Sequence, residues 1–67
     1  MNTLKFKAKL VEKEISRTEL ANIWGCTTRT VTNKITGKTP INLDEAIAFS
    51  RRAELTDEEK YTIFLSD

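Results

Sequence analysis

The apolar residues of this 67-residue chain recur at helical spacing in five short segments. Residues three and four positions apart share one face of a helix, so the pattern predicts helices rather than strands. The predicted fold is all-α, a compact bundle of about five short helices in one domain covering residues 1–67. We expect these helices over residues 3–14, 17–24, 28–36, 43–53 and 57–65.

Three of the predicted helices begin with an N-cap residue that is followed by a glutamate three positions later. Ser16 and Thr56 each precede a glutamate by three positions, and Asn42 stands three positions before Glu45. In such a capping box the cap side chain accepts a hydrogen bond from the backbone N–H of the third residue, and the glutamate reaches back to the cap N–H. We therefore expect Glu19 to return to Ser16, and Glu59 to Thr56.

The apolar positions also predict which residues form the core. In residues 3–14 the stripe consists of Phe6 and Leu10, with Leu4 and Val11 as further candidates, and most lysines of this helix are expected in solvent. In residues 43–53 we expect Leu43, Ala46, Ile47 and either Phe49 or Ser50 to face inward. In the last helix we expect Phe64 inward, with Tyr61 or Leu65 partly exposed, or else an interface with a partner.

Residues 16–37 form the most informative stretch. Gly25 is placed to end one helix in a left-handed conformation, and Thr27 is placed to cap the next. Gly37 closes that second helix, whose core face is Val31 and Ile35, four residues apart. Two short helices joined by a tight turn are predicted.

The spacing of Ala21, Gly25 and Val31 suits two helices that cross steeply over a short turn. Together with the caps and the T-N-K-I-x-G-K tail, it resembles the helix-turn-helix of the lambda-repressor-like family, which includes small Cro-type phage regulators. The resemblance covers roughly residues 4–55. It implies that the second helix reads DNA, that Arg17 contacts phosphate or supports the reading helix, and that Trp24 belongs to the core. An ordinary helical hairpin with glycine caps is the alternative.

The charge distribution favours a nucleic-acid partner more than the net charge of +1 does. Residues 1–38 carry eight basic and three acidic side chains, whereas residues 39–67 carry three basic and seven acidic ones. No carboxylate side chain occurs from Gly25 to Asn42. A surface that lies beside phosphates needs this, because a carboxylate there is repelled.

Helical phase assigns candidate roles to the polar residues around the turn. Arg29 suits guanine O6 and N7, and Asn33 suits adenine N6 and N7. The candidate base contacts are Thr28, Arg29, Thr32 and Asn33. The candidate phosphate contacts are Arg17, Thr18, Thr27, Thr30, Lys34, Lys38 and Thr39. The resemblance implies that the loop containing Lys38 and Thr39 lies over the sugar-phosphate backbone, so the backbone N–H groups near these residues are phosphate candidates as well.

The remaining composition argues against other classes of function. Histidine is absent, which disfavours an enzyme, most metal sites and His-based catalysis, and we expect no cofactor. A single cysteine and no apolar run near the ~20 residues that span a bilayer favour the cytoplasm, with no membrane partner.

The leading hypothesis is a Cro-like repressor of a phage or mobile element that occludes a double-stranded DNA operator as a homodimer. The competing hypothesis is a protein-binding modulator, an antirepressor, whose partner is another repressor protein.

Overall fold

Helices make up most of residues 1–65, the part of the chain that the computed structural model describes. The elements are α1 (Thr3–Glu12), α2 (Arg17–Trp24), α3 (Thr28–Ile35), α4 (Leu43–Arg52) and α5 (Asp57–Lys60), which continues as the π-helical turn η1 (Tyr61–Leu65). This confirms the predicted all-α bundle, and every predicted helix end lies within two residues of the observed one. Within this part of the chain, no helix has the length and apolar character needed to cross a membrane.

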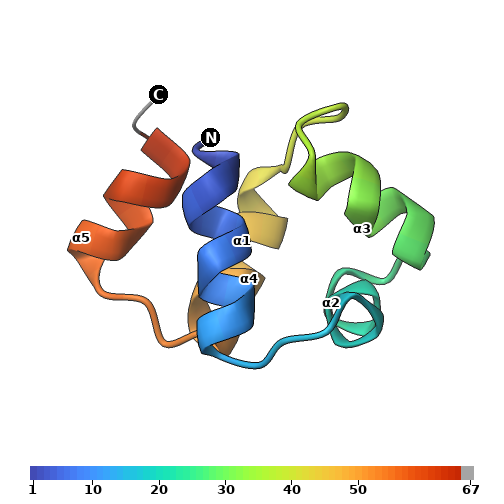
Figure 1. Cartoon of the computed structure of the whole chain (residues 1–67), viewed down its shortest axis with the longest axis horizontal. Coiled ribbons are helices and arrows are strands. Elements are labelled where there is room, and N and C mark those ends of the chain that lie inside the picture. Colours follow the sequence, from blue (N-terminus) through green and yellow to red (C-terminus); the bar gives the residue numbers. More distant parts are fainter. Residues whose placement is uncertain (66–67) are drawn as a thin grey trace.

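The helices surround α1, which runs through the middle of the molecule (Figure 1). Helix α5 and turn η1 lie on one side of α1, α2 and α3 lie on the other, and α4 lies behind it (Figure 1). The start of the chain is fastened to η1 by a backbone hydrogen bond of 2.7 Å from Asn2 N–H to Ile63 O. The α2–α3 pair therefore forms one end of the molecule.

The helix starts follow the predicted caps, with one difference. Complete capping boxes occur at Asn42 and Thr56. Ser16 Oγ accepts from the Glu19 N–H at 3.0 Å, but the Glu19 carboxylate does not return to the cap. It accepts from the Arg52 guanidinium instead and so joins α2 to α4. The expectation for Glu19 was wrong because a long-range cation offers its carboxylate a stronger, charge-assisted partner.

A stack of aromatic rings fills the core. The rings of Phe6 on α1 and Phe49 on α4 lie face to face with centroids 4.3 Å apart. The ring of Phe64 on η1 meets both nearly edge-on, at 6.1 and 6.2 Å, and Trp24 on α2 lies 6.3 Å from Phe6. Such offset and edge contacts stabilise beyond the area that they bury. Phe64 and Trp24, predicted to face the core, are half-buried and pack against the buried cluster.

Four apolar residues that the pattern favoured for the core are exposed. Leu4 and Val11 on α1 are 77% and 79% exposed, and Leu43 and Ile47 on α4 are 75% and 42% exposed. Helix α4 carries two apolar stripes, and the one that meets the Phe6 ring is that of Phe49. The other stripe, Leu43 and Ile47, consequently faces outward.

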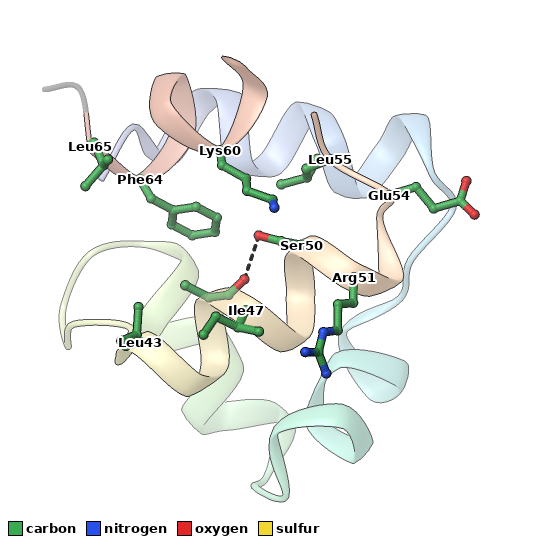
Figure 2. Close-up of a pocket in the computed structure, with 10 residues that line it drawn as sticks. Leu43, Ile47, Ser50, Arg51, Glu54, Leu55, Lys60, Phe64 and Leu65 are labelled. Carbon is green, nitrogen blue, oxygen red and sulfur yellow. Dashed lines mark hydrogen bonds between the residues drawn. The ribbon is translucent and has the colours of Figure 1, made fainter. Parts of the chain in front are cut away.

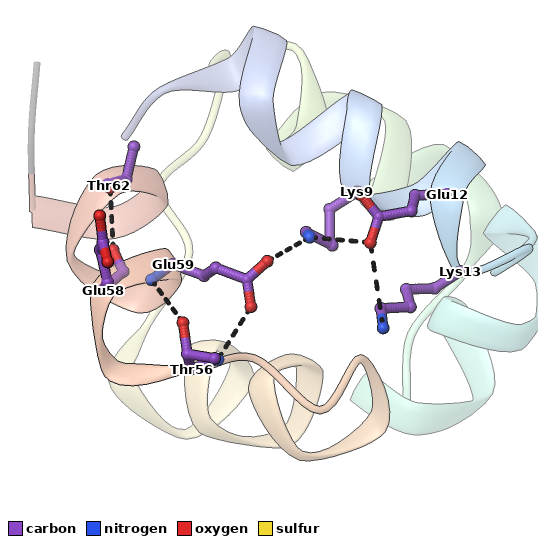
Figure 3. Close-up of polar contacts among 7 residues, drawn as sticks. All are labelled: Lys9, Glu12, Lys13, Thr56, Glu58, Glu59 and Thr62. Atoms are coloured by element: carbon purple, nitrogen blue, oxygen red, sulfur yellow. Dashed lines mark hydrogen bonds and ion pairs between the residues drawn. The ribbon is translucent and has the colours of Figure 1, made fainter.

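Lys9 also departs from the expectation that the lysines of α1 are solvated. It is only 9% exposed, and its ammonium pairs with Glu12 on its own helix and Glu59 on α5 (Figure 3). The hydrogen bond from Lys9, and then that from the Thr56 N–H, lower the pKa of the Glu59 carboxyl to about 2. The hydrogen bond that Lys9 donates to Glu59, the largest cause, raises the pKa of Lys9. This ion pair joins α1 to the C-terminal part of the chain.

Candidate nucleic-acid interface

The apolar face of helix α3 packs into the core. Val31 and Ile35 are completely buried in the core. With a step of about 100° per residue, Arg29 and Asn33 lie on the side opposite to these two. Arg29 is exposed and Asn33 is half-buried, and neither side chain has a hydrogen-bond or ion-pair partner within residues 1–65. The outer side of α3 therefore presents an unpaired guanidinium and an unpaired amide.

The turn between α2 and α3 has the predicted geometry. Gly25 adopts a left-handed conformation with φ of 67°, and Thr27 caps α3. Thr27 Oγ1 accepts from the Thr30 N–H at 3.2 Å and lies 3.1 Å from Thr30 Oγ1. The hydroxyl groups of Thr27 and Thr30 thus serve the cap first, whereas Thr28, at the start of the helix, is exposed and outside this pair.

Arg17 links the start of α2 to the middle of α3. Its Nη1 donates to Thr32 Oγ1 at 2.9 Å, and Arg17 is exposed. A predicted phosphate contact and a predicted base contact therefore touch each other. Thr18, the next residue on α2, is exposed beside Arg17. The guanidinium has five donors, so the bond to Thr32 leaves others directed to solvent.

The loop after α3 is closed by its own backbone. The N–H groups of Lys38 and Thr39 both donate to Asn33 O, at 2.9 and 3.2 Å, and the Gly37 N–H donates to Lys34 O. These amides already have acceptors within the chain, which favours the side chains over the backbone as phosphate contacts in this loop. The side chains of Lys38 and Thr39 are exposed and remain the candidates in this loop.

Lys34 has a different place from the one expected of a phosphate contact. Its ammonium pairs with the Glu45 carboxylate on α4, and its side chain is only 15% exposed. Reaching a phosphate would require breaking this ion pair. We therefore remove Lys34 from the candidate phosphate contacts.

Three of the basic side chains predicted to contact DNA keep their charge available. Arg17, Arg29 and Lys38 are exposed and form no ion pair with any of residues 1–65, whereas Lys9, Lys34 and Arg52 are paired with glutamates. The sequence had not separated these two groups of basic residues. Lys5 on α1 and Arg51 on α4 are likewise exposed and form no ion pair within residues 1–65, so free cations also occur away from α3. What distinguishes the candidate contacts Arg17, Arg29 and Lys38 from Lys34 is that their charges are available.

Lys7 is a further basic residue at the α2–α3 end that helical phase did not identify. It is exposed on α1 and lines a surface depression together with Arg17 and Ile35, at the junction of α1, α2 and α3. Only the tertiary arrangement brings it next to Arg17, because ten positions separate the two residues in the sequence.

A second surface feature lies away from α3. A groove of about 540 Å³ runs between α4 and η1, with Phe64 and Leu65 across from Leu43 and Ile47 (Figure 2). Arg51, Glu54 and Lys60 add charged groups to its lining. No residue of α2 or α3 lines this groove.

Comparisons with protein-family models, with curated proteins and with solved structures return no match to this chain. The interpretation of the α2–α3 end therefore depends on its geometry and on the sequence pattern.

Proposed function

We propose that this chain is a sequence-specific regulator that binds double-stranded DNA with α3 in the major groove. The observation that carries the proposal is the outer side of α3. Arg29 and Asn33 are unpaired there, on a helix that the buried residues Val31 and Ile35 fix against the core. A rigid helix with free, planar donor groups meets the requirement for reading base edges.

The proposed base contacts follow from the chemistry of each side chain. Arg29 donates two hydrogen bonds to guanine O6 and N7, and Asn33 pairs with adenine N6 and N7. These residues are one helical turn apart, so they reach neighbouring base pairs. Thr28 contributes a short hydroxyl, and the hydroxyl of Thr32 keeps its own donor while it accepts from Arg17.

Phosphate contacts fix the position of α3 in the proposed complex. Arg17 and Lys38 lie at the start of α2 and in the loop after α3, so they flank the reading helix in the chain. Thr18 and Thr39, next to them in the sequence, add exposed hydroxyl groups. Such contacts neutralise phosphates and position the protein without reading sequence.

In this proposal two copies bind a pseudo-palindromic operator and exclude polymerase or a rival regulator. The Cα trace measures 29 × 22 × 20 Å. Two such bodies fit side by side on major grooves that face the same way, which recur about every 34 Å along B-DNA. The resemblance of residues 16–37 to the lambda-repressor-like helix-turn-helix supports a Cro-like phage or mobile-element repressor that acts in the cytoplasm.

A protein-binding modulator, such as an antirepressor, is the competing function. The groove between α4 and η1 favours it, because Leu43 and Leu65 expose 75% and 73% of their area there. Large apolar side chains gathered in one place are typical of protein interaction surfaces.

Selection of bound duplexes from a random pool, at 50 and 200 mM salt, tests the proposal. We expect one enriched sequence with two related half-sites about ten base pairs apart. With four phosphate contacts, Arg17 and Lys38 from each of two copies, affinity falls by roughly two orders of magnitude between these salt concentrations. A pool without enrichment, or binding that ignores salt, contradicts the proposal and favours the protein-binding alternative.

A further inference from the structure

Lys34 occupies an enclosed site between three helices, although it belongs to the helix proposed to read DNA. Its ammonium pairs with the Glu45 carboxylate and lies 5.8 Å from the centroid of the Trp24 ring. The side chains of Lys34 and Glu45 are 15% and 11% exposed, so both partners are largely withdrawn from water. Lys38, four positions later, is exposed.

Glu45 connects α2, α3 and α4 at one residue. Its carboxylate accepts from Lys34 on α3 and from the Asn42 N–H at the start of α4, the latter at 3.0 Å. Its backbone oxygen accepts from Trp24 Nε1 on α2, also at 3.0 Å. Burial acts to raise the pKa of the Glu45 carboxyl, but the hydrogen bonds from Lys34 and Asn42 outweigh it, and the net pKa is lowered. The carboxylate is thus held in its charged form.

We infer that Lys34 is a positioning residue, which fixes the rotation of α3 about its axis through Glu45 and thereby aims Arg29 and Asn33 at the bases. The inference rests on the proposed function. Val31 and Ile35 seat α3 on the core through non-directional contacts. The ion pair adds a directional contact at the C-terminal half of the helix, from a side that the two apolar residues do not cover.

Removal of the Glu45 charge distinguishes positioning from phosphate contact by the sign of the effect. Glu45→Gln keeps an oxygen for the Asn42 N–H, so the cap of α4 is preserved. If Lys34 positions α3, the ratio of operator to non-specific affinity falls at least fivefold, the lower end of what one good base contact provides. If Lys34 instead becomes free to bind phosphate, affinity for every duplex rises and the salt slope steepens by about 0.9 per bound copy, about 1.8 for two copies.

Lys34→Met and Lys38→Met form a matched pair that applies the same change at a paired and an exposed lysine. Lys34→Met is expected to lower the specificity ratio at least fivefold without changing the salt slope. Lys38→Met is expected to reduce the slope by about 0.9 per bound copy, about 1.8 for two copies, without changing the ratio. Lys34→Arg keeps the charge and is expected to restore most of the ratio. A Lys34→Met protein that behaves like Lys38→Met, or that keeps the wild-type ratio, overturns the inference.

The indole N–H resonance of Trp24 reports this site without DNA. We expect this resonance to shift in Lys34→Met and Glu45→Gln but not in Lys38→Met. Only the first two substitutions change the ion pair of Glu45, the residue whose backbone oxygen accepts from the Trp24 indole N–H. An unchanged resonance in both variants overturns the arrangement around Glu45. Wild-type protein that binds no duplex refutes the proposed function instead, so the two failures are distinguishable.

Discussion

Gly25→Ala tests the turn that sets α3 relative to α2. Gly25 has φ of 67°, and a Cβ atom built there meets no atom within 4 Å. The substitution therefore introduces no clash, and its cost comes from placing an L-residue in the left-handed region, about 1–2 kcal/mol. The less flexible unfolded chain offsets about 0.4–1 kcal/mol of this. We expect a net loss of about 1 kcal/mol in the free energy of unfolding.

Urea unfolding followed by Trp24 fluorescence measures this loss. With a slope near 1 kcal/mol per molar urea, typical of the smallest domains, the midpoint falls by about 1 M. A loss above about 3 kcal/mol means that the turn needs space that the structure does not show. A midpoint that rises, as Gly→Ala produces where the backbone is not left-handed, means that Gly25 is not left-handed in solution.

Glu54→Gly is the reciprocal control for this reasoning. Glu14 and Glu54 lie two positions beyond the ends of α1 and α4 and have φ of 54°, a conformation that glycine adopts without steric cost. Glu54 is exposed and belongs to none of the ion pairs within residues 1–65, so its replacement removes little besides the strain. We expect a gain of about 0.5–1 kcal/mol, and a loss of stability contradicts the argument.

Three further predictions concern DNA contacts, pH and the core. Arg29→Ala is expected to cost about 1–3 kcal/mol of binding free energy on the selected operator and to relax preference at one base position, whereas Lys38→Ala is expected to weaken binding to all duplexes alike. Fluorescence anisotropy on matched and mutated sites measures both effects. Identical effects of the two substitutions contradict the assigned roles. Because the pKa of Glu59 is lowered to about 2, the stability from its pair with Lys9 is fully present above the unfolded pKa near 4.5 and is lost as pH falls towards 2. Urea midpoints between pH 6 and pH 2.5 are expected to fall more steeply in the wild type than in Glu59→Gln, and parallel curves refute the pairing. Phe49→Ala removes a completely buried ring and is expected to lower the free energy of unfolding by about 3–5 kcal/mol, measured by thermal unfolding. A decrease below about 1 kcal/mol contradicts the place of this ring in the core.

Local signals in the sequence predicted the helices well. The caps at Ser16, Thr27, Asn42 and Thr56 each act within three residues, and every one of them forms. The left-handed conformation of Gly25 is likewise decided by its immediate neighbours. Interactions of this range depend on the chain's own spacing and need no knowledge of the fold.

Long-range contacts were not predictable in the same way. Glu19 pairs with Arg52 rather than with its own cap, and Lys9 pairs with Glu59, fifty positions away. Several carboxylates compete for each cation, and only the packing of the helices decides which lies within reach. The same limit applies to α4, where the sequence contains two apolar stripes and the fold buries that of Phe49 rather than that of Leu43.

The candidate site contains one feature that the sequence predicted and one that depends on the fold. Phase within α3 placed Arg29 and Asn33 opposite the buried residues Val31 and Ile35, as the structure has them. The contact of Lys34 depends on Glu45, which belongs to another helix, so helical phase alone left Lys34 as a contact to phosphate or solvent. The assignment of Arg29 and Asn33 as contacts to DNA bases stays a prediction.

Mapping of amide NMR shifts during titration with the selected operator duplex tests the central claim most directly. If α3 reads DNA, we expect the largest shifts with the operator in Arg17, Thr28–Asn33 and Lys38–Thr39. A scrambled duplex is expected to shift mainly the amides of Arg17 and Lys38–Thr39. Shifts confined to the groove between α4 and η1, or an α3 that does not respond to any duplex, contradict the claim that the outer side of α3 reads DNA.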